Sequence, residues 1–216
     1  MANDPKDIAG ALIDQDGELF SERMGANISR DTPQELFHWL CGTVLLSARI
    51  SHKLAEDAGR ALRDTDFYKI DKILSEDKWD LVEVLRHNGY CRYDTVTSDY
   101  LISAATLVRE DYDDDLRKMR EAAGGADAIL ERLQDIKGIG PVGAEISARE
   151  AQLVWDELFP RLGDPAREAA SDLGLPTETD DLVDLAGNRE RFVRLTAVLT
   201  RTSLDGVDED VQDALD

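Results

Sequence analysis

Two glycines separated by one residue, Gly138 and Gly140, form the stretch of this sequence where chemistry is first expected. Apolar residues at helical spacing precede them, and Pro141 suits the first turn of a following helix, where its missing N–H costs nothing. Glycine permits positive φ and lets a backbone come close to a ligand. Unpaired N–H groups at such a turn, with the dipole of the next helix, would form an anion site that suits a nucleic-acid phosphate. The alternative for these residues alone is an ordinary turn between two packed helices.

Helices are predicted on both sides of this turn and over most of the chain. No segment alternates with period two, so we expect an all-α fold without a sheet. Residues 32–35 have the capping-box pattern with proline at the first helical position, and residues 36–48 are apolar nearly all round, which is typical of a buried central helix. We expect the helix after the turn to continue through Leu158, and another helix to be capped by Ser75.

The charge of the chain argues against an ordinary nucleic-acid-binding protein. The 216 residues include 46 acidic and 25 basic side chains, which gives a net charge of −21, whereas nucleic-acid-binding domains are expected to be basic. An acidic protein adapted to very high salt resolves the conflict, because screening there shortens the reach of like-charge repulsion to roughly 3 Å. We interpret the composition as halophilic. The alternative is a chain that does not bind nucleic acid.

The cysteine content and the hydropathy of the sequence exclude several classes of protein. Cys41 and Cys91 are the only cysteines, so neither a disulfide framework nor a zinc cluster is predicted. The N-terminus lacks the apolar core of a signal peptide, and the longest apolar run is too short to span a membrane. We therefore expect a cytoplasmic protein with no membrane partner.

The segment 136–144, IKGIGPVGA, resembles the DNA-binding hairpin of the helix-hairpin-helix DNA glycosylases of base-excision repair, the endonuclease III-like or HhH-GPD superfamily. Residues 45–49, LLSAR, resemble the end of that family's early buried helix and the loop after it. Gly163-Asp164-Pro165 resembles the segment that carries its catalytic aspartate. The resemblance covers roughly residues 32–176. It implies two helical lobes, 31–150 ending with the helix-hairpin-helix and 1–30 plus 151–216, with double-stranded DNA crossing the cleft between them.

The resemblance also implies roles for individual residues. Asp164, which lies 26 residues after Gly138, would be the catalytic carboxylate that stabilises positive charge on the sugar and orients the attacking water. An ordinary helix N-cap is the alternative for Asp164. Arg49 would reach into the duplex where a base has left, and a surface arginine near a helix end is the alternative. The residues expected to contact DNA are Arg49, Lys137, Gly138, Ile139, Gly140, Val142 and Gly143.

Two features of the family are missing from this chain. Bifunctional members carry a lysine two positions after the second hairpin glycine, where its amine forms a Schiff base, and that position is Val142 here. Many relatives hold an iron–sulfur cluster with four C-terminal cysteines, and no cysteine follows Cys91. We therefore expect an enzyme, a monofunctional glycosylase without a lyase step, acting as a monomer on double-stranded DNA with a damaged base. No cofactor is expected beyond a monovalent cation at the hairpin.

Two other function classes stay open. One is a helix-hairpin-helix protein that binds DNA without catalysis, and the other is an interaction protein that kept the fold and lost DNA. An aromatic-lined pocket beside Asp164 would favour the enzyme over the first, and a basic strip around the hairpin would favour DNA binding over the second.

Overall fold

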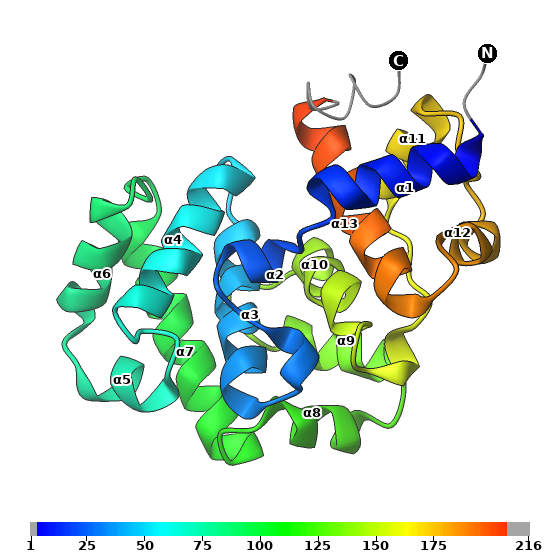
Figure 1. The fold of residues 1–216 in the computed structure, drawn as a ribbon. Helices are drawn as coiled ribbons and strands as arrows, with labels where there is room; N and C mark the ends of the chain where they lie inside the picture. Colours follow the sequence, from blue (N-terminus) through cyan, green and yellow to red (C-terminus); the bar gives the residue numbers. More distant parts are fainter. Residues whose placement is uncertain (1–3, 207–216) are drawn as a thin grey trace. The chain divides into compact units, whose positions relative to one another are not determined.

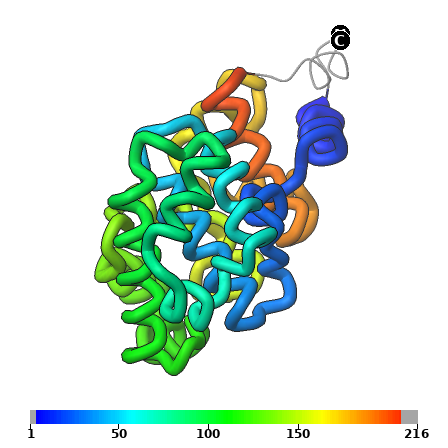
Figure 2. The backbone as a smooth tube through the Cα atoms, turned by 90° about the vertical axis from the view of Figure 1, so that its left-hand side faces the viewer, coloured from blue at the N-terminus to red at the C-terminus, as the bar shows by residue number. Residues whose placement is uncertain are grey.

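The computed structural model describes residues 4–206, and every secondary-structure element in this range is a helix (Figures 1 and 2). The prediction of an all-α chain is confirmed over these residues. The described chain divides into two compact units. Unit 1 combines residues 4–19 with 149–206, and unit 2 covers residues 20–148, so the second division falls inside a helix. No helix within 4–206 combines the length and the apolar composition needed to cross a membrane.

Unit 2 is built around the helix that the sequence predicted to be central. Its elements are α2 (Phe20–Arg23), the 3-10 helix η1 (Ile28–Arg30), α3 (Pro33–Leu46), α4 (His52–Asp64), α5 (Ile70–Ser75), α6 (Lys78–His87), α7 (Asp94–Tyr112), α8 (Leu116–Ala123), α9 (Ala126–Gln134) and most of α10 (Pro141–Ala151). Every residue of α3 from Glu35 to Leu45 is buried, and α4, α7 and α8 pack on it (Figure 1). A helix that is apolar nearly all round loses contact with water only when neighbours cover all its sides.

The start of α3 differs from the predicted capping box. Thr32 is the N-cap residue and Pro33 follows it, but the Thr32 side chain accepts no capping hydrogen bond. The Glu35 carboxylate instead accepts from the Asn27 backbone N–H at 2.7 Å and from Arg63 Nη2 at 3.1 Å. Glu35 is only 5% exposed, so these charge-assisted bonds satisfy a carboxylate that would be costly to bury alone. The glutamate therefore connects α3 to η1 and α4 and does not cap its own helix.

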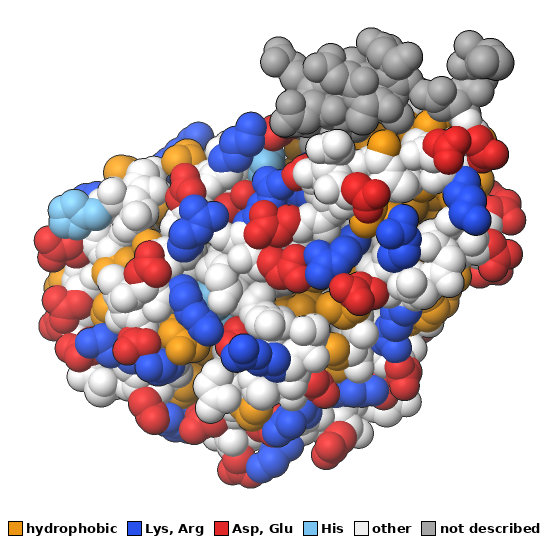
Figure 3. All heavy atoms as spheres, in the orientation of Figure 1, with side chains coloured by type: hydrophobic (Ala, Val, Ile, Leu, Met, Phe, Trp, Pro, Cys, Tyr) orange, Lys and Arg blue, Asp and Glu red, His pale blue; other side chains and the backbone are white. Residues whose placement is uncertain are grey.

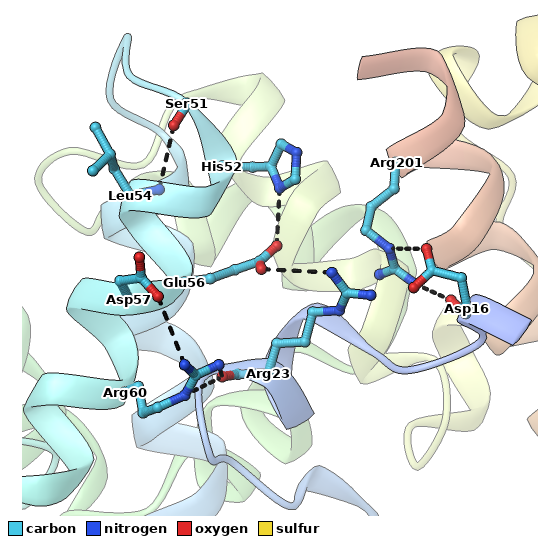
Figure 4. Close-up of polar contacts among 9 residues, drawn as sticks. All are labelled: Asp16, Arg23, Ser51, His52, Leu54, Glu56, Asp57, Arg60 and Arg201. Atoms are coloured by element: carbon cyan, nitrogen blue, oxygen red, sulfur yellow. Dashed lines mark hydrogen bonds and ion pairs between the residues drawn. The ribbon is translucent and has the colours of Figure 1, made fainter. Parts of the chain in front are cut away.

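Unit 1 is organised around its last helix. Its elements are α1 (Pro5–Asp16), the 3-10 helix η2 (Asp156–Leu158), α11 (Asp164–Asp172), α12 (Thr179–Ala186) and α13 (Arg189–Asp205). Helices α1, α11 and α12 pack around α13 (Figure 1). The buried Arg201 of α13 donates through Nε to Asp16 Oδ2 at 2.8 Å, and its Nη2 donates to the Asp16 carbonyl (Figure 4). This pair attaches the end of α1 to α13.

Two predicted helix boundaries are wrong. Helix α6 begins at Lys78, and its cap is Asp77, which accepts from the Trp79 N–H at 2.8 Å, whereas Ser75 is the last residue of α5. The helix after the glycine turn ends at Ala151, and Leu158 lies in the separate helix η2. Periodicity located the helices, but local backbone hydrogen bonds decide where each one ends.

One buried histidine in the core of unit 2 has a clear electrostatic consequence. His38 on α3 is fully buried, and its Nε2 lies 3.0 Å from the Gly59 carbonyl, so Nε2 carries the proton. No atom of the described residues pairs with its Nδ1. Burial lowers the pKa of His38 from 6.5 to about 4, because the charged imidazolium would lose its hydration. The neutral form is therefore the one that the fold accommodates.

This histidine should make the stability of the protein depend on pH. The folded-state pKa lies below the unfolded value, so the unfolded chain binds the proton first, and the stabilisation present above pH 6.5 is lost as the pH falls toward 4. We expect the free energy of unfolding to fall by up to about 3 kcal/mol over this range through His38. Urea unfolding at several pH values, compared with His38→Gln, measures the contribution. An identical pH dependence in the variant would contradict the assignment.

Candidate nucleic-acid interface

The glycine turn joins α9 to α10, and its conformation depends on one of its two glycines. Gly138 has φ +91°, a left-handed value that favours glycine. A Cβ at this position would also lie 2.5 Å from Cδ2 of Tyr100. Gly140 does not have a positive φ, and nothing lies within 4 Å of the Cβ that another residue would carry there. Gly138 is thus required by the fold, whereas Gly140 leaves open space at the surface.

Two backbone N–H groups of the turn have no acceptor in the described chain. Ile139 N–H donates to the Ile136 carbonyl at 3.0 Å, but the N–H groups of Gly138 and Gly140 have no partner among residues 4–206. The first turn of α10 contains no acidic side chain, so the positive end of its dipole is not compensated there. The turn therefore presents donors and partial positive charge, an arrangement that can hold an anion.

The side chains around the turn divide into anchors and exposed groups. Ile136 and Ile139 are 1% and 4% exposed and fix the turn to the core of unit 2. Lys137 is exposed, and Val142 is 74% exposed at the start of α10. Gly143 is buried, and a Cβ there would lie 2.5 Å from Ser47 Oγ, so this glycine allows α10 to approach the end of α3. Ile139 and Gly143 thus have packing roles that the sequence did not indicate.

A second contact fixes α10 on α3. The Trp39 indole N–H donates to the Ser147 carbonyl at 3.0 Å, and the Trp39 side chain is buried. An unpaired indole N–H at this depth would cost about 1–3 kcal/mol, so the bond favours one position of α10 along α3. The turn before α10 is therefore placed by the central helix of the unit.

Arg49 lies in the loop after α3, where the sequence placed it, and a polar cluster holds the helix that follows (Figure 4). The Ser51 hydroxyl caps α4 by accepting from the Leu54 N–H at 3.3 Å. His52 Nδ1 donates to Glu56 Oε1 at 2.9 Å, and Arg23 Nη1 lies 3.8 Å from Glu56 Oε2. These contacts attach the first turn of α4 to α2, so the loop that carries Arg49 has a fixed end.

A pocket of about 500 Å³ lies between this loop, the glycine turn and helix α7. Its α3 side is formed by Val44, Ser47, Ala48 and Arg49, its α7 side by Tyr93, Val96, Thr97 and Tyr100, and Gly138 completes it. Two of the residues expected to contact DNA, Arg49 and Gly138, therefore lie at one pocket within unit 2. The two tyrosines were not singled out from the sequence. Their spacing with Val96 and Thr97, at i, i+3, i+4 and i+7, marks one helix face and could have indicated them.

The distribution of ion pairs sets apart the cations near this pocket. Elsewhere in unit 2 many basic side chains pair with carboxylates, and Figure 3 shows Lys and Arg side chains lying among those of Asp and Glu. Within residues 4–206, none of Arg49, Lys137 and Arg92 has a carboxylate at ion-pair distance. The Arg92 Cζ atom lies 5.2 Å from the centre of the Tyr93 ring. These three cations remain available to an external anion.

Asp164 belongs to unit 1, where it is the first residue of α11. The N-cap residue is Gly163, so the N-cap hypothesis for Asp164 is wrong. The Asp164 side chain is exposed and makes no hydrogen bond or ion pair within the described chain. Its negative charge at the first position still interacts favourably with the helix dipole. The carboxylate is accessible to solvent and to a ligand.

Comparisons of the chain with protein-family models, with curated proteins and with solved structures gave no match.

The two turn glycines should respond differently to an added methyl group. Gly138→Ala places alanine at a left-handed φ against Tyr100, and we expect a loss of stability of at least about 1–2 kcal/mol. Gly140→Ala should leave stability unchanged or raise it by up to about 1 kcal/mol, since its site is open. Thermal unfolding followed by circular dichroism measures both. Equal destabilisation by the two substitutions would contradict this account of the turn.

Proposed function

We propose that the chain binds the DNA backbone through the hairpin of α9 and α10 and acts as a monofunctional DNA N-glycosylase in base-excision repair. The observation that carries the proposal is the glycine turn, whose Gly138 and Gly140 N–H groups have no acceptor among residues 4–206 and stand at a helix start without an acidic side chain in its first turn. Phosphate oxygens accept from such groups, and contacts of this kind hold a protein on a duplex without reading sequence. Lys137 at the turn adds a cation that has no carboxylate partner within residues 4–206.

The high negative charge of the chain limits how this binding works. Net charge −21 repels DNA at low salt, whereas at molar salt repulsion reaches only roughly 3 Å. Backbone donors act at hydrogen-bond distance and keep their effect under these conditions better than a distant charge does. The acidic composition and the amide-lined turn are therefore compatible in a protein that works in concentrated salt.

For the chemical step, Asp164 is the proposed carboxylate. Hydrolysis breaks the bond between C1′ and the base, water supplies the hydroxyl at C1′, and the water proton leaves with the base. Positive charge on the sugar grows in the transition state, and an ionised carboxylate stabilises it and orients the water. The exposed Asp164 side chain, with no partner in the described chain, is free to do so.

Val142 argues against a lyase step, because it occupies the position where bifunctional glycosylases carry their lysine. A Schiff base needs an amine, and the residue two positions after Gly140 has an isopropyl group that is 74% exposed. Lys137 lies on the turn itself, where phosphate contact is the proposed role. The proposed enzyme therefore releases the base and leaves the backbone intact.

A non-catalytic DNA-binding protein is the second candidate, and the surroundings of Asp164 favour it. Catalytic carboxylates are usually positioned by hydrogen bonds or partly removed from water, whereas Asp164 is exposed and has no positioning contact within unit 1. Base release is the measurement that separates the two candidates.

Asp164→Asn should abolish base release and leave DNA binding nearly unchanged. The amide cannot balance the sugar cation, while the hairpin contacts do not involve this residue. Loss of a first-turn charge should lower stability by no more than about 1 kcal/mol. The assay screens duplexes with single damaged bases in molar KCl, and Glu168→Gln, an exposed carboxylate of the same helix, is the matched control. If Asp164→Asn releases bases as fast as the unaltered protein, the carboxylate assignment fails. DNA binding without base release by any variant would favour the second candidate.

Borohydride should trap no covalent adduct between the protein and a duplex containing an abasic site. Reduction captures only an imine, and no lysine occupies the position of Val142. Denaturing gels of borohydride-treated mixtures make the measurement, with Lys137→Gln as the comparison. A trapped band that disappears in Lys137→Gln would assign a lyase step to the turn and would refute the monofunctional proposal.

A further inference from the structure

We infer that the pocket between α3, α7 and the glycine turn holds one unpaired nucleobase, so that this protein prefers DNA with an unpaired nucleotide to a fully paired duplex. The inference rests on the proposed DNA binding and assigns a ligand to a pocket that the proposed reaction does not use. It lies entirely within unit 2 and does not involve Asp164.

The walls of the pocket suit a flat, largely apolar ring. Tyr93, the N-cap residue of α7, and Tyr100 of α7 lie seven residues apart and both line the pocket, and Val44 and Val96 add apolar surface from two sides. Aromatic side chains on which a base can stack are the common means of binding single-stranded nucleic acid, because every base has a π face. The volume of about 500 Å³ falls within the range of roughly 300–1,000 Å³ found for sites that enclose small organic ligands.

Two hydroxyls of the pocket, those of Ser47 and Thr97, already donate their hydrogens within unit 2. Tyr90 donates its O–H to the Leu45 carbonyl at 3.2 Å, so Thr97 Oγ1, at 3.3 Å, must donate to the Tyr90 oxygen. Ser47 Oγ donates to the Thr43 carbonyl at 2.7 Å. These two hydroxyls therefore meet a ligand as acceptors. This suits the exocyclic amino group of adenine, cytosine or guanine.

The surroundings of the pocket suit the phosphates on either side of such a base. Arg49 and Gly138 both line it, and the N–H of Gly138 has no acceptor among residues 4–206. Arg92, next to Tyr93, has no carboxylate partner in the described chain. A base in the pocket thus has its backbone within reach of cations and amides. A free nucleobase without phosphates would lack these contacts, so the occupant is a nucleotide within a strand.

The test compares one duplex in two forms, fully paired and with a single unpaired adenine, by fluorescence anisotropy at one KCl concentration. We expect the unpaired form to bind about tenfold more tightly, the size of effect that stacking of one base on an aromatic ring gives. Tyr93→Leu should remove this preference, and Tyr93→Phe should retain it, because the ring and not the hydroxyl makes the stack. Trp79→Leu, an exposed aromatic residue of α6 outside the pocket, should have no effect.

A spectroscopic reading on the unaltered protein keeps the test independent of the folding of the variants. With 2-aminopurine at the unpaired position, stacking in the pocket should quench its fluorescence on binding, and unchanged fluorescence would overturn the inference. A single strand of the same sequence identifies the source of the base. If the single strand binds as tightly as the duplex with the unpaired adenine, the pocket takes a base from single-stranded DNA. If the single strand binds more weakly, the pocket takes a base displaced from a duplex.

The two proposals fail in distinguishable ways. Equal binding of both duplex forms, unaffected by Tyr93→Leu, would overturn the pocket inference and leave DNA binding through the hairpin in place. Absence of binding to either form in molar KCl would overturn the proposed function and the pocket inference together.

Discussion

The close packing of α10 on α3 is the constraint on which the candidate interface depends. The Trp39 indole bonds to the Ser147 carbonyl at 3.0 Å, and Gly143 leaves the space that Ser47 occupies. The first contact fixes the position of α10 along α3, and the second fixes how near the helices come. Because the glycine turn directly precedes α10, both contacts also place the Gly138 N–H beside the loop of Arg49. A buried helix far from the turn in sequence thus sets the geometry of the turn.

The electrostatics of the chain explain why short-range contacts carry the proposed binding. A chain of net charge −21 cannot attract a polyanion at a distance, and exposed ion pairs contribute little to stability, about 0–1 kcal/mol each. Many basic side chains of unit 2 are nevertheless held by carboxylates, which leaves Arg49, Arg92 and Lys137 as cations near the turn and pocket. Amide donors and aromatic faces act only at contact and are least affected by salt. The acidic surface and the proposed interface are consistent on that physical ground.

The sequence predicted those features that depend on neighbouring residues. The apolar run of 36–48 required a helix covered on all sides, and α3 is buried along its length. Pro33 and Pro141 each stand at a helix start, and Gly138 has the positive φ that the turn requires. These outcomes follow from steric limits on one or two residues, which the rest of the chain does not change.

The sequence prediction was wrong where spacing in the sequence did not reveal the actual partner or position of a side chain. Glu35 fits a capping box by spacing, yet its carboxylate bonds to Asn27 and Arg63, which fold toward it from other elements. Aspartate is a favoured N-cap residue, and Asp164 would be the N-cap if α11 began at Pro165. The helix instead begins at Asp164 itself. Side-chain oxygens bond to the donors that the fold brings nearest, so spacing alone does not determine their partners.

By itself, then, the sequence determined the all-α class, the buried central helix and the positive φ of the glycine turn, because each is a local property of backbone sterics and hydrophobic pattern. The tertiary structure alone decided that Arg49, Tyr93, Tyr100 and Gly138 share one pocket, and that the N–H groups of Gly138 and Gly140 find no acceptor in the described part of the chain. Those residues come from three separate segments. Their proximity results from the packing of α3, α7 and α10, and such packing depends on contacts between residues far apart in the chain.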